Sequence, residues 1–334
     1  MLKKISKYLK RTAFLVLFLS LGASTIRYYA IEGFRPSHEQ NFKAPAEQIF
    51  SPKTDEFSFS VLSDAGSQTR PLEYIIKKIR HSKSQFILCL GDLIRYRNPA
   101  HFNWISEEVA EKLKGIPFYM VPGNHELAKS GNKLRLYTPV FGAPNYWFSY
   151  GNTLFIGLDS AQEKISLRQF RWLENTLKKH RDDYQNCILY SHVPPFAPNG
   201  EQHHHLDKSS QKRLEKIVKT YNINLLLFGH VHYYSQSTFA GVPMYTAPSS
   251  GQKIRSQDSR FGYLKIKIKK DSISVIPKYI NKKGGSEYFE LFASNALVKR
   301  SIHNFAIYSL LCGICLLVLS GILKIISLKS KKAS

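Results

Sequence analysis

Short apolar segments alternate with amphipathic segments through the middle of this 334-residue chain, and this alternation restricts the fold more than any other feature. The apolar segments are four to six residues long, as strands are, whereas the segments between them repeat apolar residues at helical spacing. Strands that are apolar throughout are typical of sheets covered by helices on both faces, so the sequence predicts an α/β fold. The predicted strands are Phe57–Leu62, Phe86–Leu90, Phe118–Val121, Leu154–Leu158, Cys187–Tyr190 and Leu225–Phe228.

The segments between these strands predict four helices, at Pro71–Arg80, Phe102–Lys114, Leu167–Lys179 and Gln211–Thr220. Ser166 and Gln169 have the spacing of a capping box, in which each side chain satisfies a free backbone N–H at the start of a helix. After Gly241 the pattern changes to alternation of apolar and polar residues, as in Leu264–Ile268. This alternation predicts a second sheet that is rich in antiparallel pairs.

Polar residues follow five of the six predicted strands, at the point where each strand ends. In open α/β sheets ligands bind beyond the carboxyl ends of the strands, so we expect these side chains to converge on one crevice. They offer carboxylate, amide and imidazole groups, which suit Mn, Fe or Zn, and a His-x-His sequence on extended backbone directs both imidazoles to one face. The candidate ligands are Asp64, Asp92, Asn124, His192, His230 and His232.

The order of these motifs resembles that of the calcineurin-like metallophosphoesterases, specifically the branch related to purple acid phosphatases. The resemblance covers about Phe57 to Ala247 and lies in Asp64-x-Gly66, Gly91-Asp92, Gly123-Asn124-His125-Glu126, His192-x-Pro194-Pro195 and Gly229-His230-x-His232. Gln169-Phe170-x-Trp172-Leu173-Glu174, after Leu158-Asp159-Ser160, is similar to the same branch. The fold that this resemblance implies is a four-layer αββα sandwich of two mixed β-sheets.

The resemblance also implies two metal ions, with Fe, Mn and Zn as the candidates, and a role for each candidate ligand. Asp92 would bridge the metals. Asp64 and His232 would complete one metal site, and Asn124, His192 and His230 would complete the other. His125 would be the catalytic residue beside the substrate, where it can stabilise negative charge or protonate the leaving group.

Two positions depart from the family's pattern. Gly66 stands where many members of the wider superfamily have a histidine. Arg95 stands where the purple acid phosphatase branch has a tyrosine, and Tyr96 follows it. A local slip of the strand end would bring Tyr96 to the metal, and otherwise Arg95 faces the substrate phosphate, which its planar guanidinium suits.

Three consecutive histidines, His203, His204 and His205, follow in a loop rich in proline and glycine. Related phosphatases carry histidines that face the substrate in this region. The sequence leaves three interpretations open: a substrate contact, a solvated loop, or a third metal site.

Both ends of the chain carry membrane signals. Residues 1–30 contain a basic stretch and then Thr12–Ile26, fifteen uncharged residues that span ~22 Å as a helix, less than the ~30 Å hydrocarbon core. This favours a signal peptide over a signal anchor and leaves cleavage open. Phe305–Leu323 is uncharged over nineteen residues and predicts a C-terminal transmembrane helix at residues 305–328, followed by a basic tail.

The basic residues that flank these segments predict the topology. They are more numerous at the chain ends than on the inner sides of the two apolar segments, which places both termini in the cytoplasm. The intervening domain, residues 50–290, would then lie on the extracytoplasmic side of the plasma (inner) membrane.

The charge of the chain favours an anionic partner. Lys and Arg number 48 against 24 Asp and Glu, which gives a net charge of +24. The basic residues are dispersed or flank the membrane segments, so nucleic-acid binding is not expected. Four cysteines in a chain of this length exclude a scaffold built on disulfides.

The sequence therefore predicts a membrane-anchored phosphoesterase with a binuclear metal centre. It would hydrolyse phosphate monoesters by attack of a metal-bridging hydroxide, and its substrate would be a phosphorylated small molecule or lipid. One alternative is a phosphodiesterase that acts on nucleotides or lipid head groups. The alternative from another class is a catalytically weak membrane protein that binds phosphate or a partner.

Overall fold

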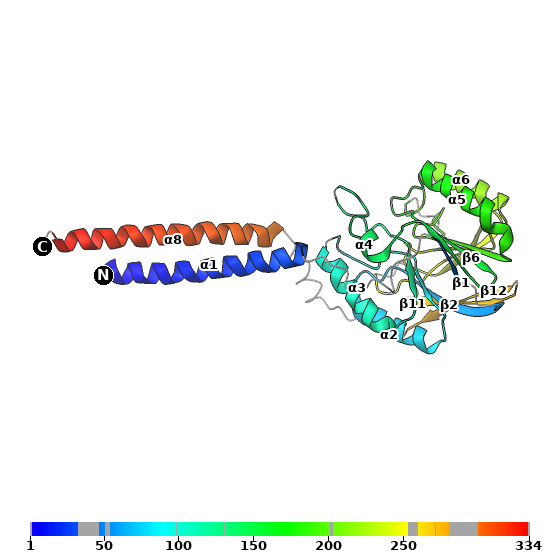
Figure 1. The fold of residues 1–334 in the computed structure, drawn as a ribbon, viewed down its shortest axis with the longest axis horizontal. Helices are drawn as coiled ribbons and strands as arrows, with labels where there is room; N and C mark the ends of the chain where they lie inside the picture. The colour runs from blue at the N-terminus through cyan, green and yellow to red at the C-terminus, as the bar shows by residue number, and fades with distance from the viewer. Residues whose placement is uncertain are drawn as a thin grey trace. The chain divides into compact units, whose positions relative to one another are not determined.

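The structure, a computed structural model, describes residues 2–32, 47–50, 54–97, 99–129, 131–198, 200, 203–252, 260–270, 272–280 and 300–332. The chain divides into two compact units. One contains the long helices α1 (Leu2–Glu32) and α8 (Arg300–Lys332). The other contains two β-sheets and the helices that cover them (Figure 1).

The larger sheet is mixed and runs in the order β1-β5-β6-β7-β8-β10-β9. Parallel pairing joins β6 to β7, β7 to β8 and β8 to β10, whereas β5 pairs antiparallel with β6 and β9 pairs antiparallel with β10. The strands are β1 (Glu47–Phe50), β5 (Tyr146–Tyr150), β6 (Thr153–Leu158), β7 (Asn186–Ser191), β8 (Leu225–Phe228), β9 (Ser235–Phe239) and β10 (Val242–Thr246).

The smaller sheet is also mixed and runs in the order β12-β11-β2-β3-β4. β2, β3 and β4 are parallel, and β11 lies antiparallel between β2 and β12. The strands are β2 (Glu56–Leu62), β3 (Ile87–Cys89), β4 (Phe118–Met120), β11 (Gly262–Lys269) and β12 (Ser272–Tyr279).

The two sheets pack face to face through a core of aromatic rings. The rings of Phe59 and Phe86 from the smaller sheet stack at 4.9 Å between centroids, and those of Phe148 and Phe155 from the larger sheet stack at 4.8 Å. The Phe59 and Phe155 rings then meet edge to face at 5.2 Å. Rings of this kind bury a large apolar area, which fixes the two sheets against each other.

Helices cover the outer faces of the sheets (Figure 1). α5 (Leu167–His180) and α6 (Lys208–Thr220) bury Leu173, Leu177, Leu214 and Ile217 against the larger sheet. α2 (Thr69–His81) and α3 (Pro99–Leu113) are the crossovers between β2, β3 and β4, and the short α4 (Thr138–Phe141) and the 3₁₀ helix η1 (Arg181–Asp183) lie in loops. The predicted four-layer αββα sandwich is confirmed.

Most predicted elements are confirmed with small shifts of their ends, because their apolar periodicity reports burial directly. The capping box is also confirmed: Ser166 Oγ accepts from Gln169 N, and Ser166 N donates to Gln169 Oε1. β1, α4 and β5 were not predicted.

The prediction of a second, antiparallel-rich sheet after Gly241 is confirmed only in part. β11 and β12 bring antiparallel pairs to the smaller sheet beside β2, but β10, the first strand after Gly241, joins the larger sheet. Alternation along a strand reports which of its faces is buried, but it does not report which neighbour the strand pairs with.

Among the described residues, one helical stretch is long and apolar enough to cross a membrane, Phe305–Leu328 in α8. This agrees with the predicted C-terminal membrane segment. Residues 281–290, the last part of the predicted domain, lie outside the described residues.

Candidate metal centre

The six candidate ligands meet where strands of both sheets end. Asp64, Asp92 and Asn124 follow β2, β3 and β4 of the smaller sheet, and the three histidines follow β7 and β8 of the larger sheet. Five of the six are buried, with Asn124 partly exposed. Positive φ angles, which are costly for residues other than glycine, occur at four of the six. They are Asp64 (56°), Asp92 (52°), His230 (69°) and His232 (62°).

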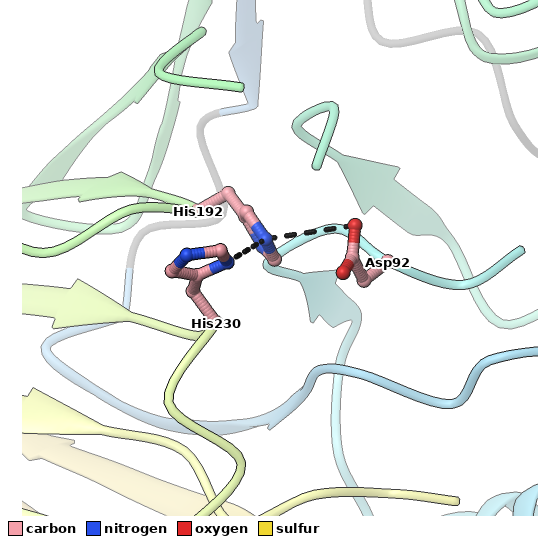
Figure 2. A group of neighbouring side chains, drawn as sticks. All are labelled: Asp92, His192 and His230. Carbon is pink, nitrogen blue, oxygen red and sulfur yellow. Dashed lines mark hydrogen bonds and ion pairs between the residues drawn. The ribbon is translucent and has the colours of Figure 1, made fainter. Parts of the chain in front are cut away.

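One cluster is centred on His192, which lies between Asp92 and His230 (Figure 2). His192 Nδ1 lies 2.7 Å from Leu90 O and must donate to it, because a carbonyl only accepts. In a neutral His192 the Nε2 atom therefore carries a lone pair of electrons. It lies 3.0 Å from His230 Nδ1, 3.2 Å from Asn124 Oδ1 and 3.5 Å from Asp92 Oδ1.

This arrangement fits a cation. Metal–nitrogen and metal–oxygen bonds of about 2.1 Å place neighbouring ligand atoms about 3.0–3.4 Å apart, which is close to these separations. The hydrogen bond from His192 Nδ1 to a backbone carbonyl is also the usual device that orients a ligating imidazole. Electron-rich atoms held this close repel one another unless a positive charge lies between them.

The second cluster consists of Asp64, Asp92 and His232. Among the described residues Asp64 Oδ1 is buried without a hydrogen bond, and it lies 3.4 Å from His232 Nε2. Burial works to raise the pKa of Asp64, but the electrostatic attraction and hydrogen bonding of His232, with further contributions from His192 and Ser63, outweigh it and bring that pKa well below its usual value. A buried carboxylate that stays ionised beside an imidazole fits a metal ligand. Asp92 belongs to both clusters, as a bridging ligand must.

His125 lies beside the clusters and is partly open to solvent, with 31% of its side chain exposed. Its Nδ1 lies 2.8 Å from Arg95 O, so this nitrogen carries a proton. Its Nε2 lies 3.9 Å from Asp92 Oδ2, and its backbone N–H donates to Asp92 Oδ1 at 2.8 Å. These contacts leave Nε2 as the atom that can exchange a proton at the centre.

Arg95 and Tyr96 lie on the loop after β3. The Arg95 side chain is exposed, and its backbone N–H donates to Ser67 Oγ at 3.0 Å. The Tyr96 ring packs edge to face on the buried His101, with 4.8 Å between ring centroids.

His204 is the member of the histidine triplet that reaches the ligands. Its Nδ1 lies 3.1 Å from His230 Nε2, and Glu163 Oε1 lies 3.8 Å from the same nitrogen. His205 Nδ1 lies 2.8 Å from Leu206 O, and His203 is exposed. A hollow of about 330 Å³ adjoins them, lined by Gln162, Glu163, Lys164, His203, His204, His205, Leu206 and Asp207.

Glu126 supports the centre in a way that the sequence analysis did not assign. It is fully buried and accepts from Asp92 N at 2.8 Å, Ile94 N at 3.0 Å and Gly123 N at 2.7 Å. Burial and the Asp92 charge raise the pKa of Glu126 to about 8, although the three hydrogen bonds partly offset them. Its place directly after Gly-Asn-His was the available signal. The side chain ties the loop of Asp92 to the loop of Asn124.

Gln252 explains the glycine at position 66. A Cβ on Gly66 would lie 2.3 Å from Gln252 Cγ, and Gly66 also has a φ of +56°. The Gln252 backbone N–H donates to Asp64 O at 2.8 Å, and its Nε2 donates to Asp92 O at 3.3 Å. Gln252 thus takes the space beside Gly66 and holds both carboxylate loops. No local motif marks this residue, because it lies far along the chain from both loops.

Gly123 approaches Asp92 so closely that an added methyl group should disturb the centre. A Cβ at this position would lie 2.3 Å from Asp92 Oδ1 and 2.5 Å from Asp92 N. We expect Gly123→Ala to weaken metal binding by at least ~10-fold, the effect typical of disturbing a group that orients a metal ligand. Metal titration monitored by calorimetry measures this loss. Gly321→Ala, where a Cβ meets nothing within 4 Å, is the control, and unchanged affinity in Gly123→Ala would contradict the geometry.

Residues 57–234 match the family model of the calcineurin-like phosphoesterases. Curated relatives include a probable glycerophosphodiester phosphodiesterase GpdQ of Arcobacter nitrofigilis, with 27% identity over 52% of this chain and 65% of that protein. A 3',5'-cyclic adenosine monophosphate phosphodiesterase CpdA of Haemophilus influenzae is 24% identical over 53% of this chain and 65% of that protein. The probable purple acid phosphatase 20 of Arabidopsis thaliana is 25% identical over 65% of this chain and 53% of that protein. The chain thus spans less than two thirds of the length of each of these relatives.

Solved structures show the same fold. A dimetal phosphatase from Danio rerio superposes with a TM-score of 0.54 at 14% identity, over 67% of this chain and 96% of that one. The purple acid phosphatase PPD1 of yellow lupin gives 0.53 at 14% identity, over 69% and 52%. Folds of this kind use two metal ions, and the two clusters that share Asp92 can hold them. The family match covers more than half of the chain, so the chain belongs to the calcineurin-like phosphoesterases, as its motifs predict.

Proposed function

We propose that this protein is a membrane-anchored phosphoesterase that hydrolyses phosphate monoesters at a binuclear metal centre. The observation that carries the proposal is the position of Asp92, whose carboxylate is within reach of both ligand clusters. When bound, the two metal ions would supply Lewis acidity toward the phosphoryl oxygens and would lower the pKa of a water molecule at the centre.

The chain's own residues would hold the metal ions and protonate the leaving oxygen. Asp64 and His232 would hold one ion, while Asn124, His192 and His230 would hold the other. His125, fixed through its Nδ1 proton on Arg95 O, can donate a proton from Nε2 to the leaving oxygen. His204 steadies the His230 ring from its outer side.

The proposed preference for monoesters rests on two imidazoles beside the ligand clusters, those of His125 and His204, and on the exposed guanidinium of Arg95 on the loop after β3. His125, His204 and Arg95 can each donate hydrogen bonds, and they would compensate the second negative charge that a monoester carries. Phosphodiester hydrolysis is the second candidate. It is supported by the names of the bacterial relatives, which include a glycerophosphodiester phosphodiesterase and a cyclic nucleotide phosphodiesterase.

Turnover of two chromogenic esters tests the proposal. The full chain in detergent, reconstituted with Mn²⁺, Fe or Zn²⁺, is expected to release p-nitrophenol faster from p-nitrophenyl phosphate than from bis-p-nitrophenyl phosphate. Asn124→Ala should abolish the release, whereas Asn132→Ala, on an exposed loop residue, should not. A preference for the bis-ester would establish the diesterase instead. Bound metal without turnover of either ester would favour the phosphate- or partner-binding protein.

We further propose the location of this activity. Residues 50–290 would lie on the extracytoplasmic side of the plasma (inner) membrane, with the C-terminus in the cytoplasm. The support is the apolar Phe305–Leu328 stretch followed by Lys329, Lys331 and Lys332, since basic residues that flank a membrane span favour its cytoplasmic side. A substrate with a lipid portion would be within reach of such an anchored domain.

A further inference from the structure

α1 and α8 contact each other along a stripe of small residues at heptad spacing. Among the described side chains of the two helices, the buried positions are Ser6, Ala13, Ser20, Ala306, Gly313 and Ser320. The helices run antiparallel, and the residues pair in one register: Ser6 with Ser320, Ala13 with Gly313, and Ser20 with Ala306. Small residues at every seventh position let two helices approach closely along their whole contact.

Hydrogen bonds join the helices at both ends of this stripe. Ser6 Oγ donates to Ser320 O at 3.0 Å, and Ser320 Oγ donates back to Ser6 O at 2.9 Å. At the other end Ser20 Oγ donates to Ala306 O at 2.6 Å. In the middle a Cβ on Gly313 would lie 2.7 Å from Leu17 Cγ, so the contact there requires glycine.

Large apolar side chains are exposed on the outward faces of both helices, after the basic N-terminal part of α1. Phe18 and Leu21 of α1 are 72% and 66% exposed, and Tyr308 and Val318 of α8 are 67% and 58% exposed. A helix pair in water buries its large apolar side chains in the interface and exposes its small or polar ones. This pair does the reverse, as helices in a lipid bilayer do.

We infer that α1 is a second membrane span, retained in the mature protein and packed on α8 through this register, so that the anchor is a two-helix hairpin. Among the described residues only Phe305–Leu328 has the length and hydropathy of a span by itself, so the inference for α1 rests on its packing against α8. Residues 12–31 carry one charge, Arg27, and twenty helical residues span about 30 Å. The contact of Ser20 with Ala306 would lie in lipid, where such interhelical hydrogen bonds are worth about 0.6–2 kcal/mol. The inference goes beyond the proposed catalytic function and does not depend on it.

The observed register does not align the apolar stretches of the two helices. It staggers the apolar stretches Thr12–Ile26 and Phe305–Leu323 by roughly one heptad, or ~10 Å. Lys10 and Arg11 must therefore reach toward the head groups.

A register shifted by one heptad is the competing arrangement, because it would align the two apolar stretches. It would place Ser6 opposite Ser327 and Ala13 opposite Ser320, so small residues would still face one another. The hydrogen bonds that Ser6 exchanges with Ser320 would be lost, however, and so would the bond from Ser20 to Ala306. Cross-links at chosen positions distinguish the two registers.

Cysteine cross-linking of the full chain in membranes tests the hairpin. In a Cys312→Ala, Cys315→Ala background, Ser6→Cys with Ser320→Cys should form an intramolecular disulfide on mild oxidation. Ala13→Cys with Ser320→Cys, the pair of the shifted register, should not. Ser6→Cys with Ala306→Cys, about 21 Å apart along the axis, is the negative control.

A second comparison places a larger side chain at the contact between the two helices. Gly313→Leu should abolish the cross-link of the Ser6–Ser320 pair, whereas Gly321→Leu, at a position with nothing within 4 Å, should leave it. Three results would overturn the inference: an intact mass that lacks the residues before Ile26, a disulfide only between chains, or preferential cross-linking in the shifted register.

Discussion

Asp92→Asn is expected to reduce kcat/KM by at least ~10³-fold and to lower the metal content of the purified protein from two ions toward one. The reason is that the carboxylate of Asp92 serves both ligand clusters and lies 3.5 Å from His192 Nε2. An amide lacks the negative charge that holds two cations close together. Stabilisation of charge by bound metals is worth several kcal/mol, and each 1.4 kcal/mol corresponds to a tenfold change in rate.

Turnover and elemental analysis of the same preparation measure both effects. Asp182→Asn, on an exposed residue of η1, controls for loss of a carboxylate elsewhere and should retain both metals and full activity. If Asp92→Asn bound two metals and kept its turnover, Asp92 would not be the bridging ligand, and the assignment of the centre would be wrong.

Glu126→Ala is expected to lower the stability of the metal-free protein by about 3 kcal/mol or more. The substitution leaves the backbone N–H groups of Asp92, Ile94 and Gly123 buried without an acceptor. An unsatisfied buried donor costs about 1–3 kcal/mol, so the loss of three acceptor contacts is large even if the loops relax. For a domain of this size the melting temperature should fall by roughly 6–12 °C.

Thermal unfolding followed by tryptophan fluorescence in the presence of a chelator measures this change. Glu126→Gln keeps one acceptor oxygen and should show a smaller decrease. Glu111→Ala, at an exposed residue whose carboxylate contacts Lys112, should leave the melting temperature within a degree or two, since exposed pairs contribute little. An unchanged melting temperature in Glu126→Ala would mean that the loops of Asp92 and Asn124 do not depend on this side chain.

The strand-end motifs could be read from the sequence because each is local. An apolar segment followed by Asp, Gly-Asp or His-x-His predicts both a buried strand and the polar side chain at its carboxyl end. The carboxyl ends of β2, β3, β4, β7 and β8 do converge, as the expected crevice requires. The ligand atoms come from two sheets, which the periodicity of single strands does not distinguish.

The supporting contacts were decided by the tertiary structure. Glu126 lies next to the ligands in sequence, but its three backbone donors come from two different loops. Gln252 is 160 residues from Asp92, whose carbonyl it contacts. Neither role has a local pattern, because each depends on where separate loops meet after the sheets have paired.

The sequence by itself determined the α/β class, the order of the ligand motifs and the apolar C-terminal helix, because periodicity and strand-end chemistry are properties of short segments, whereas the αββα layering was implied by the family resemblance of those motifs. Only the tertiary structure decided that β11 and β12 join β2, that His204 rather than its neighbours reaches His230, and that α1 and α8 meet through their small residues. Those features depend on which distant segments come into contact, and a contact between distant segments is set by the packing of the whole chain.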